Sequence, residues 1–219
     1  MALLLGRNLT RTYSVGRQLV TALATVSLEV IAGHFLVITG PSGAGKSTLL
    51  NLLSGLEKPT SGEVLYKNIS LSKINESKLA NIRNSAFGFI FQIPHVLPHK
   101  TVFENVAMPF NYGTISDPDH YKRLCLEHLE YVGLGKLVDR SPNTLSGGEL
   151  QRLVFARALV RNPEVIFADE PTGSLDAANS TIILDLLKEQ ADRGRAVVMV
   201  THEKEAMAYG SDILELKKV

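Results

Sequence analysis

Short apolar runs alternate along this chain with segments whose apolar residues recur at helical spacing. The short runs lie at 30–40 (interrupted by His34), 63–66, 87–91, 165–168 and 196–201. The helical patterns lie at 47–56, about 74–83, 101–138, 149–160 and 177–193. Strands that alternate with helices are typical of an α/β domain with a largely parallel sheet. We therefore predict this fold class.

The pattern at 101–138 predicts a mainly helical insertion between two strands of the sheet. Six of its residues share one face at helical spacing. They are Tyr121, Leu124, Cys125, His128, Leu129 and Val132.

Composition and charge narrow the class of protein. With 219 residues, 45% hydrophobic and 21% charged, the chain resembles an ordinary globular protein that is long enough for one substantial core. A net charge of +1 lacks the basic excess that usually marks nucleic-acid binding, so we expect no nucleic-acid partner. The single cysteine, Cys125, excludes an internal disulfide and a multi-cysteine metal site, which fits a reducing cytosol.

Two features of the sequence argue against direct membrane insertion. No apolar run reaches the length of a membrane span, and the run at 30–40 is predicted to be a strand. The N-terminal residues have no charged leader followed by an apolar stretch and a cleavage site, so we expect no signal peptide. A role at a membrane would then require another protein that holds this chain there.

A glycine-rich loop follows the apolar run that ends at Thr39. The loop comprises Gly40, Pro41, Ser42, Gly43, Ala44, Gly45, Lys46, Ser47 and Thr48, which match the phosphate-loop pattern G-x-x-x-x-G-K-[ST]. Its glycines allow backbone amides to surround a β-phosphate without side-chain clashes. We expect Lys46 to neutralise β- and γ-phosphate charge, Ser47 to ligate Mg²⁺ and Thr48 to reach the α-phosphate. The loop therefore predicts binding of a nucleoside triphosphate.

Polar residues suited to hydrolysis follow three other predicted strands. Asp169 stands where an acid of phosphate-loop proteins holds Mg²⁺, and the adjacent Glu170 can polarise an attacking water. His202 can donate a hydrogen bond to the γ-phosphate, and Gln92 can reach Mg²⁺ or the attacking water. The carboxyl ends of parallel strands meet at one edge of the sheet, where ligands of open α/β sheets bind. These side chains are therefore predicted to share one site with the glycine loop.

A second anion-binding segment lies later in the chain. It consists of Leu145, Ser146, Gly147, Gly148 and Glu149, and it leads into the helical pattern at 149–160. The unpaired amides of a first helical turn and the helix dipole favour an anion at such a position. One nucleotide does not need two such segments. We therefore infer that each serves a different nucleotide and that the working unit is a dimer.

The order of these elements resembles that of the ATP-binding-cassette (ABC) ATPases over nearly the whole chain. The elements are the glycine loop, Gln92, Leu-Ser-Gly-Gly-Glu, Asp169-Glu170, Ser-Leu-Asp176 and His202. The resemblance implies an α/β fold with a P-loop NTPase (RecA-like) core, an antiparallel β subdomain and an inserted helical subdomain. It implies one domain over 1–219, with the core and β subdomain at about 1–92 and 160–219 and the helical subdomain at about 93–159.

The same resemblance implies roles for single residues. It implies a head-to-tail homodimer in which each ATP lies between the glycine loop of one subunit and residues 146–148 of the other. Glu170 is then the general base, Gln92 senses nucleotide and signals to a partner, and Asp176 lies in a loop that communicates across the dimer. Tyr13 falls where the family has an aromatic that stacks on adenine, a contact worth roughly 1–3 kcal/mol. A core aromatic is the alternative role for Tyr13.

A finer resemblance is carried by residues 54–63, 91–92, 97–98 and 101–109. It is to the subgroup of lipoprotein-release, macrolide-export and cell-division ATPases. That subgroup implies a separate integral membrane permease with few membrane helices and a large extracytoplasmic domain. It also implies a peripheral position at the cytoplasmic face of the inner (plasma) membrane, where the protein transmits motion across the bilayer.

The chain departs from the family pattern at three places, none of which touches the predicted chemistry, and three alternative functions stay open. The departures are Ile93-Pro94-His95 after Gln92, in the permease-contacting region, His34 where an acid is common, and Leu150 where glutamine is frequent. One alternative is the ATPase of another ABC exporter or importer. Another is a soluble ABC protein acting on DNA or ribosomes, which the neutral charge and short chain disfavour. A third is an ATP-binding scaffold without turnover.

Overall fold

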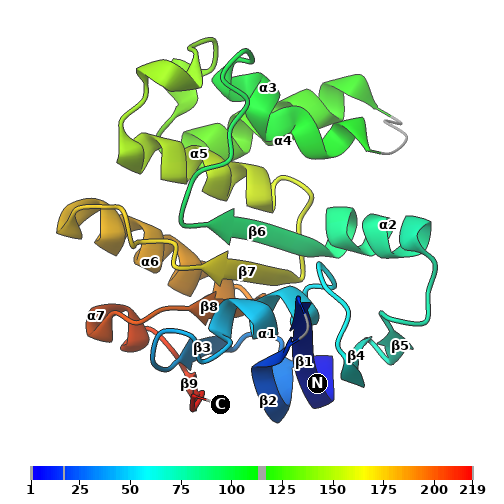
Figure 1. Cartoon of the computed structure of the whole chain (residues 1–219). Coiled ribbons are helices and arrows are strands. Elements are labelled where there is room, and N and C mark those ends of the chain that lie inside the picture. The colour runs from blue at the N-terminus through cyan, green and yellow to red at the C-terminus, as the bar shows by residue number, and fades with distance from the viewer. Residues whose placement is uncertain (1, 17, 113–116, 219) are drawn as a thin grey trace.

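The computed structural model describes residues 2–16, 18–112 and 117–218, and its strands form two sheets (Figure 1). One is antiparallel, in the order β2-β1-β4-β5. Its strands are β1 (Ala2–Val15), β2 (Gln18–Ile31), β4 (Ser61–Tyr66) and β5 (Ile69–Ser70). The other is parallel, in the order β6-β7-β8-β3-β9. Its strands are β6 (Phe87–Phe91), β7 (Val165–Asp169), β8 (Ala196–Val200), β3 (Phe35–Thr39) and β9 (Asp212–Glu215).

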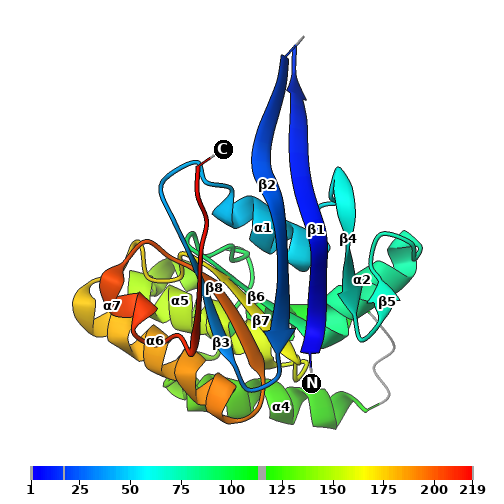
Figure 2. The ribbon, with the colours of Figure 1, turned by 90° about the horizontal axis from the view of Figure 1, so that it is seen from below.

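Helix α1 (Lys46–Leu53) packs between the two sheets and follows the glycine loop. Its four leucines are buried in one cluster with residues of β1, β3 and β7. The strands β1 and β2 form a long hairpin whose tip projects beyond the other elements (Figure 2). Because α1 is fixed from both sides, the glycine loop at its N-terminus has a rigid base.

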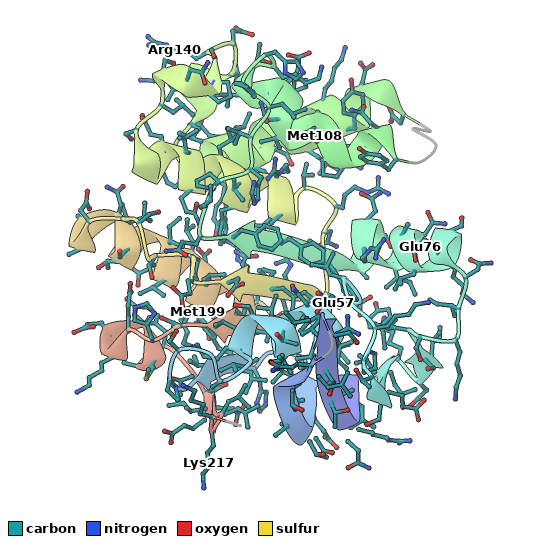
Figure 3. All side chains as sticks on the ribbon, in the orientation of Figure 1. Glu57, Glu76, Met108, Arg140, Met199 and Lys217 are labelled. Carbon is teal, nitrogen blue, oxygen red and sulfur yellow. The ribbon has the colours of Figure 1, made fainter. Side chains whose placement is uncertain are left out.

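A helical layer covers the opposite face of the parallel sheet. Between β6 and β7 it contains α3 (Val102–Ala107), η1 (Met108–Asn111), α4 (Pro118–Tyr131), η2 (Gly135–Leu137), η3 (Pro142–Thr144) and α5 (Gly147–Leu159). Outside that segment the layer includes α6 (Ala177–Asp192) and α7 (Lys204–Met207), whereas α2 (Glu76–Ala86) buries Leu79 and Ala86 in the same cluster as α1. In Figure 3, Met108 lies in the helical layer and Met199 at the level of the sheet. The strands of the sheet centre are buried on both faces, which explains their continuous apolar runs.

The structure confirms the predicted α/β fold, its parallel sheet and the helical insertion. On α4, Cys125 and Leu129 are buried, Val132 directly after the helix is buried too, and Tyr121 and Leu124 pack against the same cluster. Residues 113–116 of the predicted helical range lie outside the described residues. The division into subdomains at about residues 92 and 160 coincides with the ends of β6 and α5 and stays a prediction.

Three predicted boundaries were wrong. The run at 30–40 is two strands, because Gly33, with φ of 79°, turns the chain between β2 and β3. Helix α1 ends at Leu53, before the position predicted, because Gly55 adopts a φ of 67° that stops a helix. Helix α5 begins at Gly147 rather than at residue 149.

None of the helices in the described part of the chain is both long enough and apolar enough to cross a membrane.

Candidate functional site

The carboxyl ends of β3, β8 and β7 lie side by side and bring the predicted site residues together. In the parallel register, Ile38 is opposite Val200, and Val200 is opposite Asp169. The glycine loop follows β3, Glu170 follows β7 and His202 follows β8. The edge of the sheet therefore collects residues that are more than a hundred positions apart in sequence.

A cavity of about 700 Å³ opens at this edge. Its lining residues are Ala22, Gly40, Pro41, Ser42, Gly43, Gly45, Lys46, Ser47, Thr48, Glu170 and His202. The lining combines backbone amides, one lysine and one carboxylate. It fits a polyphosphate group whose far end meets an acid–histidine pair.

Two loop glycines allow the chain to pass close to neighbouring backbone. A Cβ added to Gly40 would lie 2.3 Å from the carbonyl oxygen of Leu216, and one added to Gly45 would lie 2.2 Å from that of Ala22. Their φ angles of 141° and 89° are also unfavourable for other residues. Glycine is therefore required at both positions for steric reasons, before any ligand is considered.

Replacement of Gly45 by alanine is expected to lower the free energy of unfolding by roughly 2–5 kcal/mol, because a backbone clash adds to the cost of a positive φ. Gly43 is a matched control, since its φ is 78° and a Cβ there would meet nothing within 4 Å. Gly43→Ala should cost only about 1–2 kcal/mol. Urea unfolding measures both values. Equal losses for the two variants would show that the contact with Ala22 is unimportant.

Lys46 lies inside the glycine loop. Its Nζ donates hydrogen bonds to the carbonyl oxygens of Gly40 (2.9 Å) and Pro41 (3.1 Å). These carbonyls hold the ammonium group beside the cavity. Neutral carbonyls bind an ammonium group less strongly than phosphate oxygens do. The phosphates of a bound nucleotide can therefore replace these two carbonyls as the hydrogen-bond partners of Lys46.

Ser47 and Asp169 are in contact beneath the loop. The Ser47 hydroxyl donates a hydrogen bond of 3.1 Å to Oδ1 of Asp169. The pKa of Asp169 is raised above its usual value, mainly because the carboxyl group is largely buried. The hydrogen bond from Ser47 and the charge of Lys46 lower it in part, and the nearby Glu170 raises it further. A partly buried carboxylate beside a hydroxyl is an oxygen-rich pair of the kind that Mg²⁺ prefers.

Glu170 and His202 form a pair at the mouth of the cavity. Nδ1 of His202 lies 3.2 Å from Oε1 of Glu170. Glu170 has a φ of 45°, which is uncommon for a residue with a side chain, and its N–H is bonded to the carbonyl of Val200. This backbone turn separates its side chain from that of Asp169, so the two adjacent carboxylates take different positions.

Four residues predicted to bind ATP or Mg²⁺ do not line the cavity in this structure: Ala44 and Asp169, which lie in or beneath the loop, and Gln92 and Tyr13, whose side chains are held elsewhere. The side chain of Gln92 packs on Gly173, where an added Cβ would be 2.8 Å from Nε2 of Gln92. The Tyr13 hydroxyl donates to both carboxylate oxygens of Glu57, and the Arg11 guanidinium lies 4.5 Å from the centre of the Tyr13 ring. Their nucleotide contacts stay predictions.

The segment Leu145–Glu149 is likewise absent from the cavity lining. Ser146 is the N-cap of α5, and its N–H and hydroxyl both donate to Oε2 of Glu149, at 2.8 Å each. These bonds from Ser146 are the main cause of the lowered pKa of Glu149. The capping box fixes the segment at the start of a helix, with its first-turn amides at an exposed end.

Sequence reasoning missed a buried glutamine behind the site. Gln151 on α5 is 1% exposed, and its Nε2 donates to the carbonyls of Phe91 (3.0 Å) and Pro171 (2.9 Å). It thereby ties the loops that carry Gln92 and Glu170 to one helix. The sequence offers one sign of this burial, because Gln151 stands within the largely apolar helical pattern at 149–160.

A second cavity, which we call the side groove, has a volume of about 670 Å³. Its lining comes mainly from α2, β6, η1 and α5, with further residues from loops, among them Leu56 after α1. The lining residues are Leu56, Ser77, Ala80, Asn81, Arg83, Asn84, Phe87, Gly88, Phe89, Phe91, His95, Met108, Pro109, Tyr112, Arg157, Ala158 and Arg161. Arg157 donates to the carbonyl of His95, in the loop after Gln92. The side groove is therefore connected to the first site through that loop.

Comparison with known proteins decides the family. A family model described as ABC transporter matches residues 23–173. The chain belongs to the ABC transporter family. It is an ATP-binding subunit of this family, and its activity is the hydrolysis of ATP.

Relatives with curated names agree with this assignment. An uncharacterized ABC transporter ATP-binding protein of Methanocaldococcus jannaschii is 42% identical, over 96% of this chain and 92% of its own. A macrolide export ATP-binding/permease protein of Chlorobium phaeobacteroides is 41% identical over 94% of this chain, which spans 31% of that longer protein.

Solved structures agree as well. A dimeric ATP-binding cassette in a post-hydrolysis state, bound to ADP and Pi, superposes with a TM-score of 0.90 at 39% identity. The match covers 98% of this chain and 94% of that one.

Proposed function

We propose that this ABC subunit forms a head-to-tail homodimer that encloses two ATP molecules. The main support for this proposal is that the two anion-binding segments of one chain do not meet at the same cavity. The glycine loop lines the nucleotide cavity, whereas Ser146–Gly148 does not. A second chain would supply the missing segment. The similar cassette solved as a dimer with ADP and Pi supports this arrangement.

Glu170 acts as the general base in this proposal. Its carboxylate lines the cavity opposite the glycine loop and is accessible to a water molecule. The neighbouring His202 orients the carboxylate and donates to the γ-phosphate, while Lys46 stabilises the charge that develops as phosphate leaves. ATP binding closes the dimer because the γ-phosphate gives Ser146 and its adjacent amides an anion to bind.

The residues below the loop fit a Mg²⁺ ion. Ser47 and Asp169 would hold it, with Gln92 joining if its side chain moves away from Gly173. The ion would neutralise phosphate charge there. Before any ligand binds, the Ser47–Asp169 hydrogen bond already places these two oxygen ligands together.

The side groove is the proposed docking site for a membrane permease of the lipoprotein-release or macrolide-export type. Its floor is apolar, with Phe87, Phe89 and Phe91, and it borders the loop that carries Gln92. A change at Gln92 can therefore reach the docked partner. Through this partner the subunit would be held at the cytoplasmic face of the inner (plasma) membrane.

Asn105 belongs to the segment 101–109, and its side chain is buried inside the protein. It is 0% exposed, and its side chain bonds the backbone of Leu97 in both directions, at 2.7 and 3.1 Å. It therefore shapes the loop beside the groove and cannot touch a partner directly.

Site-directed cross-linking tests the docking proposal. Burial raises the pKa of Cys125 to about 12, so a cysteine introduced at the surface would be the reactive thiol. Ser77→Cys places a thiol at the exposed rim of the side groove. We expect it to cross-link in native membranes to an integral membrane protein with four membrane helices and a large external domain.

The matched control is Thr181→Cys, an exposed position on α6 outside the groove lining. It should give no such product. Equal cross-linking from both positions would contradict docking in the groove. A partner with the many helices of an importer core would instead contradict the assigned subgroup.

A further inference from the structure

The side chain of Asn179, in the first turn of α6, lies directly on the start of α5. A Cβ built on Gly148 would be 2.0 Å from Oδ1 of Asn179 and 2.3 Å from its Cγ. The amide can therefore occupy this place only because residue 148 has no side chain. This contact joins the Ser146–Gly148 segment to the loop that contains Asp176.

Three hydrogen bonds involving Asn179 hold this contact in one orientation. Its Nδ2 donates to Oδ2 of Asp176 (2.9 Å), and its Oδ1 accepts from Nη1 of Arg152 on α5 (3.3 Å). Its backbone N–H donates to the other carboxylate oxygen of Asp176 (2.8 Å). Because a guanidinium only donates and a carboxylate only accepts, the amide cannot be reversed without losing both side-chain bonds.

Asp176 is held firmly as a result. Asn179 engages both of its oxygens, and the backbone N–H and then the side chain of Asn179 are the main causes of its lowered pKa. The carboxylate therefore stays ionised at neutral pH. Hydrogen bonds to ionised groups are stronger than those between neutral groups, so the loop is tied to the amide and, through the amide, to α5.

We propose that Asn179 is a positioning residue that makes the Ser146–Gly148 segment and the Asp176 loop move as one unit. The inference rests on the proposed function, in which the Ser146–Gly148 segment faces the second protomer, and on the predicted role of the Asp176 loop in communication across the dimer. Helix α5 lies in the segment between β6 and β7, and α6 follows β7, so the amide joins two separate parts of the fold at this face. When the partner's ATP draws Ser146 inward, Asp176 moves with it.

The test uses the Glu170→Gln background, in which ATP-bound dimers should accumulate. Asn179→Ala removes the amide, and Asn179→Asp places a second carboxylate beside Asp176. Light scattering over a range of protein concentrations is expected to show dimerisation about tenfold weaker with alanine and weaker still with aspartate. Titration of monomer with a fluorescent ATP analogue should show unchanged affinity. Ser180→Ala, one residue further on α6, is the matched control and should dimerise normally.

A double-mutant cycle separates coupling from a general loss of folding. Gly148→Ala alone should severely impair dimerisation, because its Cβ would strike the amide of Asn179. In the Asn179→Ala background the same change should weaken dimerisation less than it does alone, since the atoms it would strike are gone and only its effect on the predicted ATP contact of Gly148 remains. Simply additive defects would overturn the inference.

Two further outcomes have distinct meanings. If Glu170→Gln forms ATP dimers and Asn179→Ala does not weaken them, the positioning role is wrong while the proposed function stands. If Glu170→Gln forms no ATP-dependent dimer, the proposed function fails, and this inference fails with it.

Discussion

Replacement of Glu170 by glutamine is expected to slow ATP hydrolysis by roughly 10²- to 10⁴-fold, the range that a general base contributes. Glutamine keeps the size of the side chain and a group that can meet His202, whose Nδ1 lies 3.2 Å from the carboxylate. It removes the basic oxygen that accepts the proton of water. ATP binding should survive, because the glycine loop and Lys46 are unchanged. The dimer should then accumulate with ATP, since hydrolysis no longer removes the γ-phosphate.

Single-turnover phosphate release measures the loss, and gel filtration with ATP measures the dimer. Glu203→Gln is the matched control, because Glu203 accepts a hydrogen bond of 2.8 Å from Thr172 in the same loop region but does not line the cavity. It should retain turnover close to that of the parent. A Glu170→Gln protein that released phosphate at the parent rate would show that another group activates the water.

The sequence predicts the glycine loop well because the loop's shape is a local property. Gly40, Gly43 and Gly45 all have positive φ, and their spacing alone implies a curled backbone between a strand and a helix. The sequence predicts equally well that three polar residues lie at this edge of the sheet, namely Asp169, Glu170 and His202. Asp169 is the last residue of a buried strand, Glu170 and His202 come after buried strands, and parallel strands place their carboxyl ends at one edge of the sheet.

The β1–β2 hairpin and β9 could not be found from apolar patterning. In β2 only Leu23 and Val30 are buried, and register shifts between the two strands break the alternation of apolar and polar residues. β9 has only four residues and lies at the edge of its sheet, with Leu214 as its single partly buried side chain. Family resemblance, rather than periodicity, indicated the antiparallel sheet.

The positions of Gln92 and Tyr13 depend on contacts that no sequence pattern specifies. Gln92 can rest on Gly173 because that residue has no side chain, and Tyr13 is held by Glu57, far away in sequence. The link from Asn179 to Gly148 is of the same kind. Such contacts are decided by packing between segments, so the sequence predicts which residues are available and the structure determines which of them meet.

Loss of the Ser146 hydroxyl is expected to reduce hydrolysis by roughly 10²-fold and to prevent efficient ATP-driven dimerisation, while monomeric ATP binding stays intact. Ser146 does not line the cavity of its own chain, and in the proposed dimer it contacts the ATP bound by the partner. Ser146→Ala also removes the N-cap of α5, which costs about 1 kcal/mol of stability. The experiment must therefore separate recognition of ATP from stability of the helix.

Thr101→Ala provides the matched control for stability. Thr101 and Glu104 form the same capping box at the start of α3, with Thr101 Oγ1 accepting from the Glu104 N–H at 3.1 Å. This variant should lose similar stability in thermal unfolding yet keep ATP-driven dimerisation. A second variant, Ser146→Asp, keeps a good N-cap but presents a negative charge to the γ-phosphate, so it should dimerise even less than Ser146→Ala. Normal dimerisation of Ser146→Asp would rule out contact between this segment and a partner's ATP, because a carboxylate cannot replace a hydroxyl against phosphate without strong repulsion.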